Sequence, residues 1–167
     1  MNAGQKRVVV AGVGVILAGA LAVLGLWLGR GGMVRKTGFI TPSMEERAKS
    51  GEPAEPPETL QYQEFEVAAG NEVGLALKPQ AKDREMTIYF VAKAENTDFL
   101  RLRVLSEEKE KLAETGLIEP GSFVEKLWLS REVADGEAVV IEIMTYAPET
   151  FYSDGTTRIK LLVQAED

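Results

Sequence analysis

The stretch Phe99-Leu100-Arg101-Leu102-Arg103-Val104-Leu105 decides the expected fold, because apolar and basic side chains alternate along it. Successive side chains of a β-strand point to opposite faces of the sheet. Leu100, Leu102 and Val104 therefore share one face, and the two arginines share the other. A strand with this pattern has one face in a hydrophobic core and the other in water, so we expect a half-buried β-strand here.

Similar patterns recur on both sides of this stretch and are separated by turn residues. The clearest is the last one, in which Ile159 and Leu161 share a face and Arg158 and Lys160 lie on the other. The expected strands are Tyr62–Ala68, Val73–Leu77, Met86–Lys93, Phe99–Leu105, Phe123–Leu129, Ala138–Tyr146 and Thr156–Gln164.

Short strands at this spacing are typical of an all-β fold with two packed antiparallel sheets. We expect an Ig-like antiparallel β-sandwich over residues 61–167. About 105 residues are enough for one hydrophobic core of this kind without disulfides. Ser106–Ala113 is rich in Glu and Lys and fits either a hairpin turn or a single helical turn, and the sequence leaves this choice open.

An apolar run without charged residues extends from Val8 to Leu28. About 20 apolar residues allow an α-helix to cross a hydrocarbon core of roughly 30 Å, and a helix satisfies its own backbone hydrogen bonds in lipid. We therefore expect a transmembrane helix over residues 8–29, preceded by a short cytoplasmic tail over residues 1–7.

A secretory signal peptide is the alternative interpretation of this run, because Ala20-Leu21-Ala22 resembles a signal-peptidase site. Signal-peptide cores have roughly 7–15 apolar residues, whereas this run continues through Trp27. Basic residues nearly balance at the two ends, so they do not set the orientation. We expect the N-terminus inside, because the large acidic remainder is more typical of an exported domain. The protein is then a single-pass protein of the cell membrane with an extracytoplasmic C-terminal domain.

Small residues recur at intervals of four in the expected helix, and this spacing lets two helices approach closely. Ala and Gly are common in membrane helices, so simple anchoring is the alternative to a specific helix–helix contact. A specific helix–helix contact would allow the chain to form a homo-oligomer. The candidate helix–helix contact residues are Gly14, Ala18, Ala22, Gly25 and Gly29.

Residues 30–60 form an expected flexible stalk between the helix and the β-domain. The stretch Ser50-Gly51-Glu52-Pro53-Ala54-Glu55-Pro56-Pro57-Glu58 combines Pro, Glu, Gly and Ser with almost no apolar side chains. Such a segment buries too little surface to offset the entropy of ordering, and its proline-rich part is expected to be extended and semi-rigid. The stalk would hold the β-domain away from the membrane.

The composition excludes several kinds of chemistry. The 167 residues include no cysteine and no histidine, which excludes disulfides, thiolate zinc sites, cysteine nucleophiles and imidazole bases. Nineteen Lys and Arg residues face 26 Asp and Glu residues, for a net charge of −7. This sign opposes binding of nucleic acid, which depends on cationic side chains at the phosphates. We expect no cofactor.

Carboxylates are abundant, but no pair of them predicts an acid–base site. Glu107 and Glu110 lie in the least apolar part of the domain, where nothing would desolvate a carboxyl group and raise its pKa. Glu142 is the one charge in an apolar strand, and we expect it on the exposed face or paired with an arginine such as Arg101 or Arg103. The sequence therefore does not predict an enzyme.

Three aromatic residues are the expected contact surface for a protein partner. Val124, Leu127 and Leu129 follow the core positions of their strand, which places Trp128 on the outer face. Phe151 and Tyr152 lie on an extended loop before the last strand. Exposed aromatic side chains are enriched at the centres of protein interfaces.

Several stretches of the sequence follow a family pattern. They are Met44-Glu45-Glu46, Phe99–Leu105, Thr115-Gly116-Leu117-Ile118-Glu119-Pro120-Gly121, Asp135-Gly136 and Tyr146-Ala147-Pro148-Glu149-Thr150. Together they resemble small envelope proteins of clostridial-type Gram-positive bacteria, which implies one N-terminal membrane helix followed by an Ig-like β-domain. The chain departs from that pattern by Ala147 in place of Asp and by the longer insert Phe151-Tyr152-Ser153. The resemblance implies an architecture and no activity, because the family has no assigned function.

These observations favour a membrane-anchored, extracytoplasmic structural or adaptor subunit of a cell-envelope or surface assembly, acting by protein–protein interaction. The alternatives are a membrane-tethered sensor and a cell-wall carbohydrate-binding module or hydrolase. We expect protein partners in the membrane or envelope.

Overall fold

The computed structural model describes residues 39–166, and residues from Thr41 onward form one unit. No helix within residues 39–166 is both long enough and apolar enough to cross a membrane. The expected transmembrane helix over residues 8–29 lies outside the described residues. The same holds for its candidate contact residues Gly14, Ala18, Ala22, Gly25 and Gly29.

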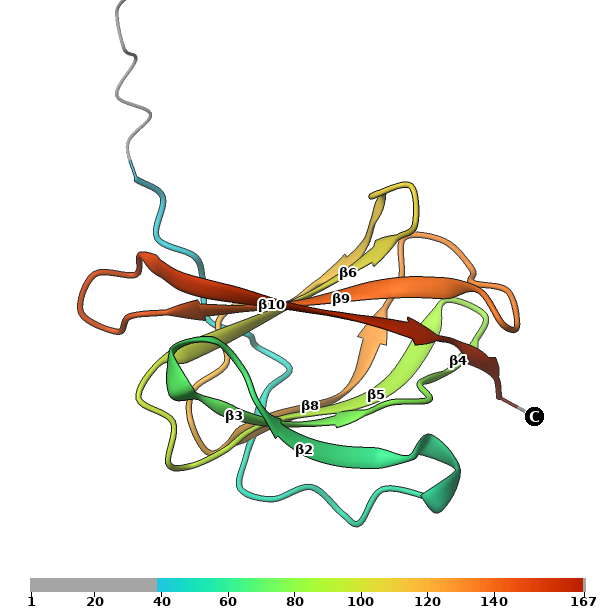
Figure 1. Cartoon of the computed structure of the whole chain (residues 1–167), viewed down its shortest axis with the longest axis horizontal. Coiled ribbons are helices and arrows are strands. Elements are labelled where there is room, and N and C mark those ends of the chain that lie inside the picture. The colour runs from blue at the N-terminus through green and yellow to red at the C-terminus, as the bar shows by residue number, and fades with distance from the viewer. Residues whose placement is uncertain (1–38, 167) are drawn as a thin grey trace, which may run out of the picture. The chain divides into compact units, whose positions relative to one another are not determined.

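Residues from Lys49 onward are built mainly of β-strands, which form two sheets packed face to face (Figure 1). The first sheet has the order β1-β8-β5-β3-β2, with β4 beside β5 and β11 beside β4. Its strands are β1 (Lys49–Ser50), β2 (Tyr62–Glu66), β3 (Glu72–Ala76), β4 (Gln80–Lys82), β5 (Glu85–Ala92), β8 (Ser122–Trp128) and β11 (Gln164–Ala165). The second sheet has the order β10-β9-β6-β7. Its strands are β6 (Phe99–Ser106), β7 (Lys111–Glu114), β9 (Ala138–Tyr146) and β10 (Ser153–Leu162).

All strand pairs are antiparallel in the described chain except β4–β11, which is parallel. Two short 3-10 turns, η1 (Glu58–Leu60) and η2 (Ala68–Gly70), flank β2. This arrangement confirms the all-β prediction with two antiparallel sheets. The stretch Ser106–Ala113, which the sequence left open, is a hairpin between β6 and β7. The Ser106 N–H donates to the carbonyl of Glu110 over 2.9 Å to close it.

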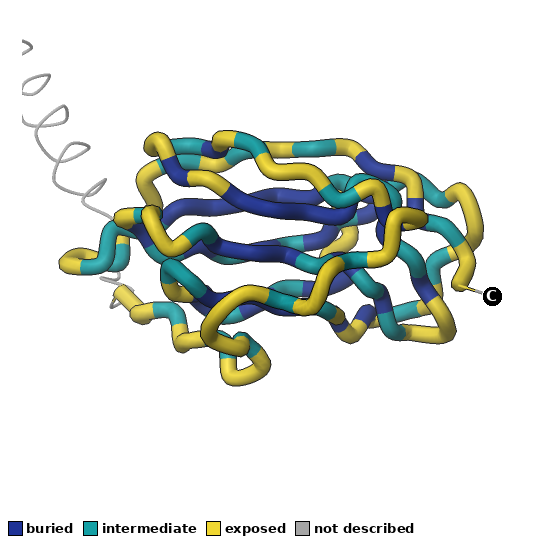
Figure 2. The backbone as a smooth tube through the Cα atoms, turned by 90° about the horizontal axis from the view of Figure 1, so that it is seen from below, coloured by how far each residue is buried: buried dark blue, intermediate teal, exposed yellow. Residues whose placement is uncertain are grey.

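The hydrophobic core lies between the two sheets, where Figure 2 shows the buried segments. Strand β6 alternates as the sequence predicts, because Leu100, Leu102 and Val104 are all 0% exposed and the two arginines between them lie on the other face. From the opposite sheet, Ile88 and Phe90 of β5 are buried in the same core cluster. Each fully buried side chain of this size contributes roughly 1.5–3 kcal/mol relative to an exposed one.

Residues 43–51 and Leu60 differ from the expected flexible stalk, because they are attached to the β-domain. The Leu117 N–H donates to the Ser43 carbonyl over 2.8 Å, and the Glu45 N–H donates to the Leu117 carbonyl over 2.8 Å. Strand β1 then pairs with Phe123 and Ser122 of β8, and Leu60 is 1% exposed. Backbone hydrogen bonds hold this segment, and these do not depend on apolar side chains. We call residues 43–51 the clasp and residues 52–57 the strap.

The Glu45 carboxylate fixes the clasp to the domain. Its side chain is 6% exposed and accepts a hydrogen bond from the Gly116 N–H over 2.7 Å and one from Arg47 Nε over 2.7 Å. Only glycine fits at position 116, because an added Cβ would lie 2.6 Å from the Met44 backbone. Met44-Glu45 and the Thr115–Gly121 stretch, which are far apart in the sequence, therefore meet in the fold.

A row of alternating charges crosses the outer face of the second sheet. Arg158, Glu142, Arg103 and Glu114 lie in register on β10, β9, β6 and β7. Glu142 accepts from Arg158 Nε over 2.7 Å and from Arg103 Nη1 over 3.3 Å, while Arg103 Nη2 lies 2.6 Å from Glu114 Oε1. The expected pairing of Glu142 with Arg103 is confirmed, and Arg158 adds a second cation.

Two of these carboxyl groups, Glu45 and Glu114, ionise more readily in the fold than in free solution. Burial acts to raise the pKa of Glu45, but hydrogen bonds from Arg47 and the Gly116 backbone outweigh it and lower the pKa below 4.5. Burial also opposes ionisation of Glu114, whose pKa is nevertheless lowered by hydrogen bonds from Arg103 and Lys111 and by the charge of Arg101. Both groups therefore stabilise the fold only while they are ionised.

We predict that the protein loses stability in acid. Because the folded-state pKa values lie below those of the unfolded chain, the stabilisation is present above pH of about 4.5 and is lost as the pH falls through the folded-state values. Glu114→Gln should lower the free energy of unfolding at pH 7 by about 1 kcal/mol, a figure reduced for solvent screening, and should flatten the acid dependence. Urea unfolding between pH 7 and pH 3 measures both effects. The exposed Glu149→Gln is the matched control, and equal acid dependence in the two variants would contradict the prediction.

Candidate functional site

The hairpin between β9 and β10 reaches beyond the end of the sandwich at the left of Figure 1. Its loop begins at Ala147 and ends at Tyr152, and the Ala147 N–H donates to the Tyr152 carbonyl over 3.1 Å. A second bond, from the Phe151 N–H to the Ala147 carbonyl over 2.8 Å, tightens the loop. The hairpin therefore presents Phe151 and Tyr152, two of the three residues predicted for a protein contact.

Phe151 has a backbone conformation that favours glycine, with φ of 58°. A residue with a Cβ atom loses roughly 1–2 kcal/mol in this left-handed region. The Phe151 ring packs against Phe99 of β6, with 5.9 Å between ring centroids and 31° between ring planes. Aromatic pairs of this kind contribute about 0.5–1.5 kcal/mol beyond their buried area. The ring contact therefore offsets the strain of the loop.

Two further aromatic residues complete this surface, which we call the aromatic tip: Phe99, Tyr146, Phe151 and Tyr152. Phe99 and Tyr146 are directly opposite each other on β6 and β9, so their side chains share the outer face of the second sheet. The Tyr146 hydroxyl donates to the sulfur of Met144 over 3.8 Å. Tyr152 is the most open of the four, at 62% exposed.

The base of this hairpin is fixed against η2. The Thr145 hydroxyl donates to the Gly155 carbonyl over 3.3 Å, and the Ala68 N–H donates to the Thr157 hydroxyl over 3.0 Å. A Cβ added at Gly155 would lie 2.5 Å from the Cβ of Ala68, so glycine lets β10 approach η2 closely. The aromatic tip is thus attached to a rigid base, which lowers the entropy lost when a partner binds.

Trp128, the third predicted contact residue, lies at the other end of the sandwich. It is paired with Glu85 at the start of β5, whereas the chain passes from the far end of β5 into Phe99. Trp128 is 60% exposed, and the Arg84 guanidinium lies 5.9 Å from its ring centroid. Trp128 and Tyr152 are exposed and Phe151 is half-buried, and the fold divides the three between two separate surfaces.

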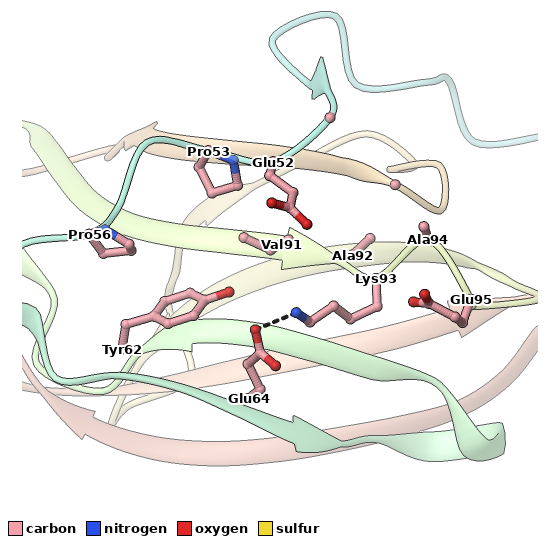
Figure 3. A pocket seen from close by; sticks show the side chains of 12 residues that line it. Glu52, Pro53, Pro56, Tyr62, Glu64, Val91, Ala92, Lys93, Ala94 and Glu95 are labelled. Carbon is pink, nitrogen blue, oxygen red and sulfur yellow. Dashed lines mark hydrogen bonds and ion pairs between the residues drawn. The ribbon is translucent and has the colours of Figure 1, made fainter.

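A cavity of about 380 Å³ lies between the strap and the outer face of the first sheet (Figure 3). Pro53 and Pro56 of the strap form one side, and Tyr62 and Val91 lie on the sheet side. Gly74 makes room for Tyr62, because a Cβ added there would lie 1.6 Å from the Tyr62 hydroxyl oxygen. We call this cavity the strap pocket.

Charged side chains also converge on the strap pocket. Lys93 Nζ forms an ion pair with Glu64, and the carboxylates of Glu52 and Glu95 line the same cavity. Sequence analysis missed this site. Two signals could have indicated it: a glycine interrupting the strand around Gly74, and two prolines three residues apart in a segment interpreted as free stalk. Within residues 39–166, no three acidic side chains are arranged to hold a metal ion.

No family model matches the chain, and no match was found among curated proteins or solved structures. The resemblance to clostridial-type envelope proteins therefore stays a prediction.

We predict that glycine is tolerated better than alanine at position 151. Phe151→Ala removes the ring contact with Phe99 and keeps the strained backbone, whereas Phe151→Gly removes both. Phe151→Gly should therefore be more stable than Phe151→Ala by about 1 kcal/mol. Urea unfolding of the two variants measures the difference. Equal stability would show that the loop adopts another conformation.

Proposed function

We propose that this chain is a membrane-anchored, extracytoplasmic adaptor of a cell-envelope or surface assembly, which binds a protein partner through the aromatic tip. The observation that carries the proposal is Phe151, a large aromatic residue in a loop conformation that favours glycine. Glycine is the residue that this conformation favours, and among residues 39–166 Phe151 and Tyr89 are the two aromatic residues that adopt a positive φ. The Phe151 ring packs against Phe99, and the next residue along the chain is the exposed Tyr152.

The chemistry of the aromatic tip fits a protein contact. Tyrosine and phenylalanine provide large contact areas with few rotatable bonds, and such residues are enriched among those that dominate binding energy. The fixed base at Thr145 and Gly155 keeps the tip in one arrangement before binding. A rigid aromatic surface of this kind supports the binding of a partner.

The strand order supports an Ig-like sandwich for the domain. In such folds the strands are named A to G, with A, B and E in one sheet and G, F, C and C′ in the other. Strands β3, β5 and β8 follow the first order, and β10, β9, β6 and β7 follow the second. Ig-like domains bind partners through end loops, faces or an edge strand.

The proposed membrane anchor rests on the apolar sequence over residues 8–29. In the proposed topology the N-terminus is inside and the β-domain is outside. The anchor would tether the β-domain to the membrane, where an adaptor of an envelope assembly meets its partners.

We predict that cross-linking and purification of the tagged full-length protein from its native membrane recovers a stoichiometric protein partner. Tyr152→Ser should reduce the recovered partner by about tenfold, because loss of one interface anchor residue costs about 1.4 kcal/mol or more. Quantitative mass spectrometry of the purified complex measures the change.

Trp128→Ser is the matched control, since Trp128 has nearly the same exposure, 60% against 62% for Tyr152, at the other end of the sandwich. It should leave partner recovery unchanged. Recovery of the chain alone in the wild type would overturn the proposal. Retention of the wild-type chain on purified peptidoglycan, lost in Tyr152→Ser, would instead favour a carbohydrate-binding module.

A further inference from the structure

The strap is held at both ends and not in its middle. The Gly51 N–H donates to the Gly121 carbonyl over 2.8 Å, and the Lys78 N–H donates to the Leu60 carbonyl over 2.9 Å. Between these points, residues 52–56 make no backbone hydrogen bond within residues 39–166. The strap can therefore move away from the sheet without breaking the ladder of either sheet.

The side chains of the strap nevertheless face the sheet in a regular way. Pro53 and Pro56 are half-buried and line the pocket, while Ala54 and Glu55 between them are exposed. Three residues per turn is the period of a polyproline II helix, so one face of the strap points at the sheet. Pro53 and Pro56 therefore form one wall of the cavity, and Glu52 lines it beside them.

The opposite wall of the pocket is aromatic. Tyr62 lies over Gly74 on the outer face of the first sheet, and its hydroxyl makes no hydrogen bond to any group in residues 39–166. Burial raises the pKa of Tyr62, so the hydroxyl stays protonated at neutral pH. A ring in this position offers its face and a neutral hydroxyl to a ligand.

One ammonium group already occupies an edge of the pocket. Lys93 lies beside the Tyr62 hydroxyl in Figure 3 and pairs with Glu64, and that hydrogen bond raises its pKa. Glu52 and Glu95 line the same pocket, and the charge of Glu52 also acts on Lys93 and contributes to the raised pKa of its ammonium group. The pocket is therefore lined by three carboxylates and one ammonium group. The ion pair of Lys93 with Glu64 is an example of how a carboxylate of this pocket binds an ammonium group.

From this geometry we infer that the strap pocket binds an organic ammonium group on a short aliphatic stem, with Glu52 and Glu95 as its anionic partners and Tyr62 as the surface for its stem. A cavity of about 380 Å³ is within the range of small-molecule sites. The carboxylates of the described residues are not arranged to surround a metal ion. Aromatic faces also attract cations, which adds to the charge attraction. The inference stands independently of the aromatic tip, which lies on the other sheet.

Isothermal titration of the full-length protein in detergent with 1,5-diaminopentane tests the inference. We expect saturable binding at one site, weakened by about fivefold in Glu52→Gln because one partly exposed charge pair is lost. Glu55→Gln is the matched control. Glu55 belongs to the same strap, carries the same charge and does not line the pocket, so its removal should leave binding unchanged.

Other variants and probes separate a built site from general attraction to an acidic protein. Glu95→Gln should weaken binding as Glu52→Gln does, while Tyr152→Ser should not change it. The neutral probe 1-pentanol and the anion glutarate should not bind. Absence of diamine binding, or equal weakening by Glu52→Gln and Glu55→Gln, would overturn the inference.

The same titration distinguishes two sources of the ammonium group. The peptide acetyl-Ala-Lys-Ala-amide carries the group on a protein side chain, and 1,5-diaminopentane carries it on a free amine. Tighter binding of the peptide would assign the pocket to a lysine of a protein partner, and tighter binding of the diamine would assign it to a small amine. In each case weaker binding to Glu52→Gln than to Glu55→Gln locates the ligand in the strap pocket.

Discussion

The register between β6 and β9 is the constraint on which the second sheet depends. It runs without a shift from the Phe99–Tyr146 pair to the Ser106–Val139 pair. A slip of one residue would turn the apolar face of β6 to water and bring Arg101 and Arg103 into the core. The same register opposes Arg103 to Glu142 and Phe99 to Tyr146. One pairing therefore sets the core, the charge row and the base of the aromatic tip.

Local alternation predicted this part of the fold well. The burial of Leu100, Leu102 and Val104 was predicted from the alternation of side chains along a strand alone. The pairing of Glu142 with Arg103 was predicted because a charge in an apolar strand is rarely left unpaired. Position along the chain was a poorer guide to surfaces. Trp128 and Tyr152 are both exposed aromatic residues, but strand order places them at opposite ends of the sandwich, and that order depends on pairings between distant segments.

The clasp shows why composition is a poor guide to the structure of residues 43–51. Few apolar residues in a segment argue against a core, yet Glu45 and the backbone of Ser43 attach the segment through hydrogen bonds to Gly116 and Leu117. The donors and acceptors come from a loop about 70 residues later, so no local window contains both halves. Residues 43–57 consequently add no free length between the predicted membrane helix and the β-domain. The strap pocket was missed for the same reason, because its two walls are also distant in sequence.

Phe151 and Gly74 each break a local rule, and each does so at a surface. Phenylalanine stands where the loop favours glycine, and glycine stands inside a strand where a side chain would stabilise the sheet. In both cases the unusual residue allows an aromatic side chain to pack: Phe151 packs against Phe99, and Tyr62 packs over Gly74. Departures of this kind concentrate where function competes with stability. Because the two surfaces belong to different sheets, occupation of one surface leaves the other open.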